Sequence, residues 1–492
     1  MAKATKSKRK TPARTKGKKA RAAAGSTVMA WQDDPESKLS AIAQPVPNLS
    51  KAPLGFRIKG PAVKAGSYQT GTPQFRYWNA ASALRRGGDF WAPLLGVSGW
   101  EPGGLLPVGL DEGVDFNAFY DRTQLAFFHD SARGKIVFSG ESPDVVCHEM
   151  GHACLDAHRP ELWDAPFIEA GSFHESFGDT SAILSALQLK DVRVAALNGV
   201  RQDKPSQLSR LAEQLGAAIR ESAPSAVDPD CLRNACNNFE YVDPQTLPDS
   251  APATELCAEV HSFSRVFTGA FYDILSGMLK IRSKSPTEAD LAAVATDYAK
   301  LLVDATAAAP VQPNYFAQVA AHLIDADTAK FGGKYRNALV TAFVDRKIIP
   351  QSAVQSLVAF RGKVPKAAFG VVAAADRPGK PQIRKVHLSA SDFGMKETRP
   401  LVVDAPVEHK PVLMVSAAML HRHTELDDHV QQATHRFVKM LFARDRVDTQ
   451  TRSRKLAVSP TARRHHRHTH VLLESAEGLR LVRRLFHCGR CC

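Results

Sequence analysis

The apolar and polar positions of the chain follow two different periods. From about 51 to 140, short apolar runs separated by Gly, Pro and Ser predict strands and turns, among them GDFWAPLLGVSGW, LAFFH and KIVFSG. From about 143 to 350, apolar residues recur at helical spacing, as in SFSRVFTGAFYDILSGML, and this spacing predicts amphipathic helices. The pattern therefore predicts an α+β protein with a mixed β/α N-terminal part and a mostly helical part after it.

Two flanking regions differ from this central part. Residues 1–50 begin with KATKSKRKTPARTKGKKAR and carry little apolar surface, so we expect a disordered basic tail and linker. Residues 351–385 are typical of a linker. After them, RPLVVDA and KPVLMVSAAM predict strands, DDHVQQATHRFVKMLFARD predicts a helix, and THVLLESAEGLRLVRRLF predicts a hairpin. We expect a domain at 51–350, with lobes of about 51–170 and 171–350, and a linker with a small α/β extension at 351–492.

The net charge of +14 is concentrated at the two ends of the chain. It divides into +10 over residues 1–24, +8 over residues 451–492, and −4 over the residues between them. A body this close to neutral argues against sequence-specific binding of nucleic acid. We expect at most non-specific contact with polyanions through the basic tails.

The absence of a recognisable targeting signal and the number of cysteines indicate where the protein is expected to be located. No stretch approaches the roughly 18 apolar residues of a membrane span, and AAAGSTVMAW is short for a secretory signal, so we expect a cytoplasmic protein with no membrane contact. Eight cysteines in 492 residues do not make a disulfide framework. We expect Cys147 and Cys154 to be small buried residues. A single CxxC is a weak metal signal, so we expect a structural or incidental role for Cys488, Cys491 and Cys492.

The candidate chemistry begins with HEMGH at 148–152, on a predicted helix that starts at Ser142-Pro143. Ser is suited to accept a hydrogen bond from the first-turn amides, and Pro is tolerated at the first helical position. Residues four apart share a helix face, so His148 and His152 can reach one cation. Glu149 lies about 100° around the helix, where it can address a metal-bound water instead of the metal.

A second predicted helix supplies a third ligand. Glu175 and Asp179 in GSFHESFGD are four residues apart and share a face. Two histidines and a glutamate are a standard ligand set for catalytic zinc, and a ligating imidazole usually donates its other N–H to a carboxylate such as Asp179. The alternative, a solvated acidic face, is disfavoured by the apolar residues around the pair. We therefore predict one catalytic metal bound by His148, His152 and Glu175.

His158 is a competing third ligand. It stands six residues after His152, a spacing that requires a glycine at position 155 so that the helix can break and turn back. That residue is Leu155. In a continuous helix His158 is rotated about 240° from His152 and faces elsewhere.

These residues resemble the thermolysin family of gluzincins. DVVCHEMGH followed by ESFGD is similar to the metal motifs of that family, and FNAFY at 116–120 is similar to its edge strand. EVHSFS at 259–264 resembles the segment that carries its transition-state histidine, and NYFAQ at 314–318 resembles its last helices. The resemblance covers roughly 60–350, and the sequence between the motifs is not specific.

The resemblance implies a two-lobed zinc metalloendopeptidase. Glu149 would be the general base toward a zinc-bound water, and His261 would stabilise the tetrahedral intermediate. Asn117 and the Ala118 carbonyl would bind the substrate backbone. Arg233, 28 residues before His261, would contact a substrate carbonyl by its position.

Two departures from the family pattern are relevant to activity. Residues 153–174 contain no Tyr to match the transition-state tyrosine of the family, and Trp163 lies in that region instead. Residues 180–189 contain no carboxylate, so calcium is not expected. An alternative is a catalytically impaired relative that serves as a binding or structural module, with basic tails on polyanions. The intact Glu149 argues against this alternative, because a scaffold does not need that carboxylate.

Overall fold

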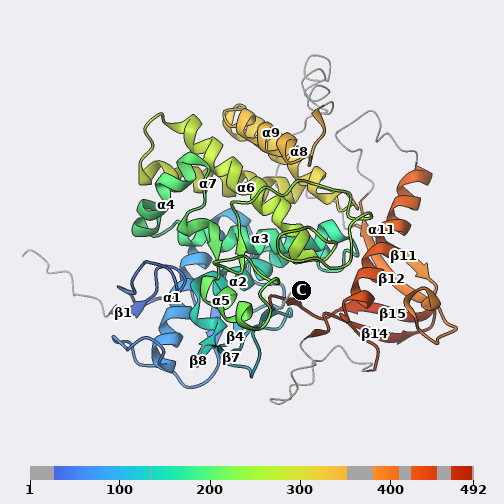
Figure 1. Cartoon of the computed structure of the whole chain (residues 1–492), viewed down its shortest axis with the longest axis horizontal. Coiled ribbons are helices and arrows are strands. Elements are labelled where there is room, and N and C mark those ends of the chain that lie inside the picture. The colour runs from blue at the N-terminus through green and yellow to red at the C-terminus, as the bar shows by residue number, and fades with distance from the viewer. Residues whose placement is uncertain (1–26, 133, 352–380, 409–422, 451–466, 490–492) are drawn as a thin grey trace, which may run out of the picture.

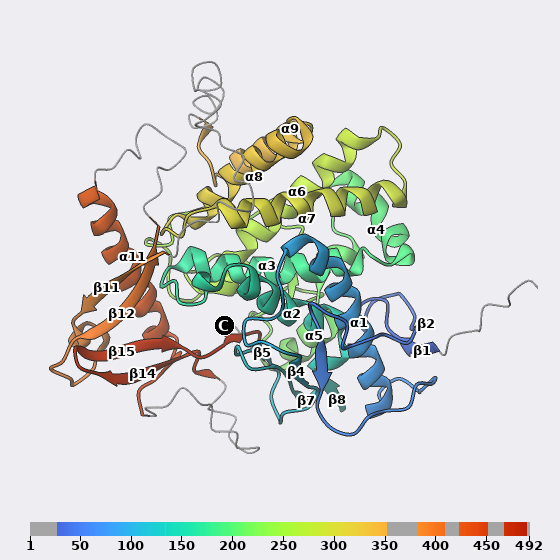
Figure 2. The same ribbon diagram turned by 180° about the vertical axis from the view of Figure 1, so that it is seen from behind.

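The computed structural model describes residues 27–132, 134–351, 381–408, 423–450 and 467–489 (Figure 1). The fold is mixed α and β, with a large helical body and a smaller C-terminal unit at its side (Figure 2). Within these ranges, no helix combines the length and the apolar character that crossing a membrane requires.

The N-terminal part of the body holds a five-stranded sheet in the order β16-β5-β6-β4-β3. Its strands are β3 (Phe56–Ile58), β4 (Leu106–Gly109), β5 (Ala118–Tyr120), β6 (Leu125–Phe127) and β16 (Phe486–His487). A separate hairpin pairs β7 (His129–Ala132) with β8 (Lys135–Phe138). LAFFH and KIVFSG were predicted to be β-like, and they contain β6 and β8.

The long helix α1 (Pro73–Leu95) replaces a predicted strand. GDFWAPLLGVSGW was expected to be β-like, but its first eight residues form the end of this helix. Thr72 caps the helix by accepting from the N–H of Phe75, and the left-handed Gly96 ends it. Trp91 is buried and stacks on Phe177 at 5.1 Å between ring centroids, so tertiary packing decides the conformation of this segment.

The expectation of a disordered tail through residue 50 is wrong for residues 27–50. They contain the antiparallel strands β1 (Thr27–Ala30) and β2 (Ile42–Pro45), and Val28 and Ala30 are fully buried. The buried Asp34 accepts from Ser142 Oγ at 2.6 Å and from the N–H of Gln214 at 2.9 Å. Ser142 therefore does not cap its helix through its side chain as predicted; it links that helix to the N-terminal segment.

The helical body is built around two neighbouring helices, α2 (Pro143–His158) and α3 (Ile168–Ala186). A Cβ at Gly151 would lie 2.9 Å from the Cα of Gly178, so glycine at both positions lets the helix backbones approach closely. The remaining helices of the body are α4 (Lys190–Gln202), α5 (Glu213–Ser222), α6 (Val260–Arg282), α7 (Glu288–Ala308), α8 (Tyr315–Phe331) and α9 (Arg336–Asp345). A two-residue ladder pairs β9 (Arg210–Leu211) with β10 (Arg233–Asn234).

The C-terminal unit is the predicted α/β extension. Its sheet has the order β11-β12-β15-β14-β13, and helix α11 (His423–Ala443) packs on it. The strands are β11 (Gln382–Leu388), β12 (Leu401–Val407), β13 (Val447–Asp448), β14 (His470–Ser475) and β15 (Gly478–Arg483). The hairpin at Glu477-Gly478 is confirmed, β11 begins inside the predicted linker, and KPVLMVSAAM lies outside the described residues.

The end of the chain leaves this unit and returns to the body. After β15, the chain runs from the C-terminal sheet toward the helices of the body and forms β16 against β5 (Figure 1). Two units that are distant in sequence therefore share one strand pair. Sequence patterns did not predict this pairing, because two residues are too short for a periodic signal.

The buried carboxylates near Asp34 predict a pH-dependent stability. Burial raises the pKa of Asp34 to about 7. It also raises the pKa values of the neighbouring Asp33 and Asp144. Between pH 3.8, the ordinary pKa of the group, and about 7, the folded state holds a proton that the unfolded state has released. The free energy of unfolding therefore falls as pH rises through this window, by about 1.4 kcal/mol per pH unit for one proton.

We expect Asp34→Asn to weaken this dependence, since the amide cannot ionise. Thermal unfolding of wild type and variant at steps between pH 4 and 8 measures the difference, with the exposed Asp191→Asn as control. Parallel curves for wild type and Asp34→Asn would contradict the expectation.

Candidate metal centre

Helices α2 and α3 bring the predicted ligands together in the interior. His148, His152 and Glu175 are each at most 3% exposed. A Cβ at Gly178 would lie 2.6 Å from the His148 ring, so the glycine of ESFGD makes the space that this imidazole occupies.

The three predicted ligand residues form one compact group. One ligand atom from each of His148, His152 and Glu175 lies within 4.8 Å of the other two. The Glu175 carboxylate oxygen Oε2 is 3.3 Å from His148 Nε2 and 3.6 Å from His152 Nε2. The donor atoms of both imidazoles therefore face the same carboxylate, as the spacing predicts.

The polar atoms of this group fit a cation better than they fit one another. His148 Nε2, His152 Nε2 and both Glu175 carboxylate oxygens are buried and have no hydrogen-bond partner among the described residues. Both carboxylate oxygens of Glu149 share this condition. Buried polar atoms without partners are costly, and a bound metal would satisfy the lone pairs of the first three residues.

Each imidazole is held from behind by a second buried group. Asp179 accepts from His148 Nδ1 at 3.0 Å, as predicted for a carboxylate behind a metal ligand. His152 Nδ1 lies 2.9 Å from His174 Nδ1, and one hydrogen bond joins these two rings. Both Nδ1 atoms are thus engaged, and this leaves Nε2 of each ring as the donor for a metal.

Arg233 reaches this group through Asp179. Its guanidinium donates to both carboxylate oxygens of Asp179, at 2.7 and 3.2 Å. This charge, with the hydrogen bond from His148, holds the pKa of Asp179 below its usual range although burial acts the other way. Arg233 is 7% exposed and lies at the site, but its established contact is with Asp179.

His261, at the start of α6, approaches Glu175 from another side. Its Nε2 is 3.2 Å from Glu175 Oε2, and Glu259 Oε1 accepts from its Nδ1 at 2.7 Å. His261 is not a member of the compact ligand group. The structure therefore places it beside the predicted ligand residues.

Burial and neighbouring charges set the protonation of the ligands. Burial raises the pKa of Glu175, but the imidazoles of His261, His152 and His148 outweigh it and lower the pKa to about 2. Burial lowers the pKa of His152 to about 3. A carboxylate that stays ionised and an imidazole that stays neutral are the forms that bind a metal. Burial acts to lower the pKa of His148, but Cys488, Asp179 and Glu175 outweigh it and raise this pKa well above its usual range. A metal would therefore have to displace a proton from His148.

The predicted substrate strand runs beside the metal ligands. Asn117 is buried, and neither polar atom of its side chain has a hydrogen-bond partner among the described residues. The Ala118 carbonyl accepts from the N–H of Cys488 at 2.9 Å. Both predicted binding residues are therefore at the site, and the chain's own C-terminal segment occupies the backbone acceptor.

His158 and Trp163, both weighed in the sequence analysis, are also located. His158 ends α2, and its Nε2 lies 3.1 Å from the Val303 carbonyl oxygen, so it faces away from the ligands as predicted. Trp163 is 3% exposed and packs edge-on against Phe486 at 5.3 Å. Cys147 and Cys154 are buried, as expected.

Three residues of the site were not predicted. His174 and Glu259 orient His152 and His261, and each precedes a predicted residue by one or two positions, so the motifs contained them without assigning a role. Cys488 Sγ lies with His148 and Glu149 in a second group whose ligand atoms are within 4.8 Å of one another. The expectation of a structural or incidental role does not explain this position. The remaining cysteines of that motif, Cys491 and Cys492, lie outside the described residues.

Comparison of the chain with protein-family models and with curated proteins gives no match. The interpretation of the site therefore depends on its geometry and chemistry.

Replacement of Arg233 can distinguish its contact with Asp179 from the predicted contact with a substrate carbonyl. Arg233→Met leaves the buried Asp179 without its cation, so we expect the free energy of unfolding to fall by about 3 kcal/mol. Denaturant unfolding of the metal-free protein measures this loss, with Arg210→Met as a control at a more exposed ion pair. Unchanged stability would mean that the contact with Asp179 contributes little, and it would favour a role on substrate alone.

Proposed function

We propose that this chain is a zinc-dependent metallopeptidase with a thermolysin-like, two-lobed architecture. The observation that carries the proposal is the group of His148, His152 and Glu175, whose buried donor atoms face one another without hydrogen-bond partners in the described chain. Two imidazoles and one carboxylate are the ligand set of hydrolytic zinc sites, which keep a fourth position open.

The ligand chemistry supports zinc over the hard cations. Calcium and magnesium prefer oxygen donors, whereas two of these three ligands are imidazole nitrogens. When bound, zinc lowers the pKa of a coordinated water to about 7 and polarises a carbonyl oxygen. Asp179 and His174 would fix the orientation of the two ligating rings through their Nδ1 atoms.

Glu149 is the residue for proton transfer. It follows His148 directly on α2, is fully buried, and has neither carboxylate oxygen engaged by a hydrogen bond from the described residues. Such a carboxylate can accept the proton of the attacking water and return it to the amine that leaves. Its surroundings exclude bulk water, which would otherwise compete for that proton.

His261 and β5 supply the contacts to substrate. Glu259 orients the His261 ring through Nδ1, which directs Nε2 toward the ligands, where a donor can stabilise developing negative charge. An extended peptide can add to β5 by backbone hydrogen bonds, with the Ala118 carbonyl as acceptor. Asn117, with its free amide group, lies next to that acceptor.

The second candidate is a catalytically impaired module that binds without cleaving. Two observations favour it: the family tyrosine has no counterpart in residues 153–174, and the chain's own end lies on β5. The intact Glu149 supports the peptidase instead, and the two candidates differ in what replacement of this residue does.

The metal assignment predicts one tightly held zinc per chain. We expect His152→Ala to lose it, because removal of one of three ligands leaves an incomplete site. Elemental analysis after dialysis against a weak chelator, which removes ions from the His-rich segment ARRHHRHTH at 462–470, provides the measurement. His158→Ala is the matched control, since this histidine is on the same helix and faces Val303. Stoichiometric zinc in His152→Ala would contradict the assignment.

The catalytic assignment predicts different effects for two variants that keep the ligands. Glu149→Gln should retain zinc and lose nearly all hydrolysis of a peptide library, because the amide cannot accept the proton of water. His261→Ala should lower turnover by about a few hundredfold with little change in zinc content, as expected for one lost oxyanion donor. No calcium dependence is expected. If wild type binds zinc, cleaves no peptide, and behaves like Glu149→Gln in every assay, the binding module is the better description.

A further inference from the structure

The C-terminal segment 486–488 lies on the strand where a peptide substrate would bind. Phe486 and His487 form β16, which pairs antiparallel with β5 in the register Phe486–Tyr120 and His487–Phe119. Cys488 continues this pairing by donating its N–H to the Ala118 carbonyl. Without β16, β5 would be the edge of its sheet, with backbone groups free to pair with an added chain.

The side chain of Phe486 fills the space over the metal ligands. Its ring is 1% exposed and stacks on His174 at 3.9 Å and on His152 at 4.9 Å between centroids. Arg483 covers the other side, with its guanidinium carbon 4.2 Å from the centre of the Phe486 ring. The Phe486 ring therefore lies between the two histidines and Arg483, and this packing holds the segment in the site.

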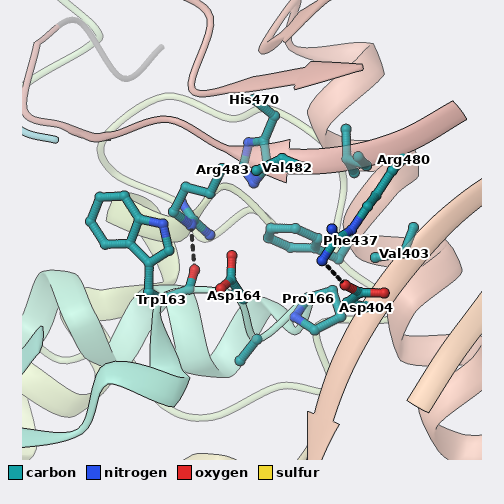
Figure 3. Close-up of a pocket in the computed structure, with 12 residues that line it drawn as sticks. Trp163, Asp164, Pro166, Val403, Asp404, Phe437, His470, Arg480, Val482 and Arg483 are labelled. Atoms are coloured by element: carbon teal, nitrogen blue, oxygen red, sulfur yellow. Dashed lines mark hydrogen bonds and ion pairs between the residues drawn. The ribbon is translucent and has the colours of Figure 1, made fainter. Parts of the chain in front are cut away.

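A hydrogen bond joins the C-terminal sheet to the loop beside the site, and this bond determines where segment 486–488 enters the site. Arg483 donates to the Trp163 carbonyl at 2.9 Å, across the pocket between β15 and the loop after α2 (Figure 3). Figure 3 also shows Arg480 paired with Asp404 farther along the same pocket. β16 begins three residues after Arg483. The hydrogen bond from Arg483 to Trp163 therefore positions the following residues next to β5.

Cys488 brings a metal-binding atom to the reacting side of the site. Its thiol sulfur is grouped with His148 and Glu149, and Arg233 donates to it at 3.9 Å. The residue is 2% exposed. A Cβ at the following Gly489 would lie 2.9 Å from the Phe116 carbonyl oxygen, so glycine lets the chain stay close to the strand.

A second observation points to a ligand at the same place. Glu149 belongs to the same group as Cys488, and both of its carboxylate oxygens are buried without a hydrogen-bond partner among the described residues. Thiolate sulfur is among the preferred ligands of zinc, and a catalytic site has one position open for a ligand. Sulfur from the chain's own end would close that position.

We infer that the C-terminal segment is a built-in inhibitor of the site, with β16 pairing on β5 as a peptide would and the Cys488 thiolate serving as the fourth metal ligand. The inference rests on the proposed zinc-peptidase function. The segment blocks the site in two ways: it occupies the backbone acceptor of Ala118, and it takes the place that water needs beside Glu149. Substrate then gains access when the segment leaves β5.

Cobalt in place of zinc tests the ligation without any activity assay. We expect the full chain loaded with Co²⁺ to show the intense near-ultraviolet absorption of a thiolate-to-cobalt charge transfer. Cys488→Ala should lose this band and keep one bound Co²⁺, because its three other ligands are unchanged. Cys236→Ala is the matched control: this half-buried cysteine lies outside both ligand groups and should keep the band.

Hydrolysis of a quenched peptide by the zinc-loaded proteins tests the inhibition. Cys488→Ala should be at least about tenfold faster than wild type, because catalysis needs an open metal position. Absence of the band in wild type, or measurable hydrolysis at equal rates by the two proteins, overturns the inference. A thiolate band in wild type with no hydrolysis by either protein overturns the peptidase proposal and leaves Cys488 as a metal ligand.

Discussion

The structure depends on one buried carboxylate oxygen, Glu175 Oε2, which three buried imidazoles face. Three imidazole Nε2 atoms, from His148, His152 and His261, lie within 3.6 Å of a single Glu175 oxygen. Placing lone pairs and an ionised carboxylate in a dry interior costs several kcal/mol unless a cation or a proton compensates. Asp179 and Glu259 accept hydrogen bonds from Nδ1 of His148 and His261, so residues outside the predicted ligand set also orient these rings.

The close approach of α2 and α3 makes this arrangement possible. Gly151 and Gly178 let the two helices touch, and Gly178 also leaves the space for the His148 ring. The N-terminal segment supports the start of α2 through the hydrogen bond from Ser142 to Asp34. The site thus draws on residues from both ends of the chain, because β16 closes it from the other side.

The sequence predicted the parts of the site that depend on local spacing. His148 and His152 are four residues apart on one helix, as are Glu175 and Asp179, and helix geometry alone puts each pair on one face. The mixed α and β content and the C-terminal hairpin were also readable from periodicity. What failed depended on tertiary contacts: α1 overrides an apparent strand through the packing of Trp91, and residues 27–50 fold because they bury Val28 and Ala30. Cys488 is 313 residues from Glu175, and no local pattern relates such a residue to the site.

The strand pairing of β16 on β5 lies beside the three predicted metal ligands. The central claim is that a single zinc ion binds His148, His152 and Glu175. Crystal diffraction collected above and below the zinc absorption edge tests this claim most directly. We expect one anomalous peak at roughly 2.0–2.2 Å from Nε2 of both histidines and from the Glu175 carboxylate. A peak only in the His-rich segment, or ordered water alone between α2 and α3, would contradict it.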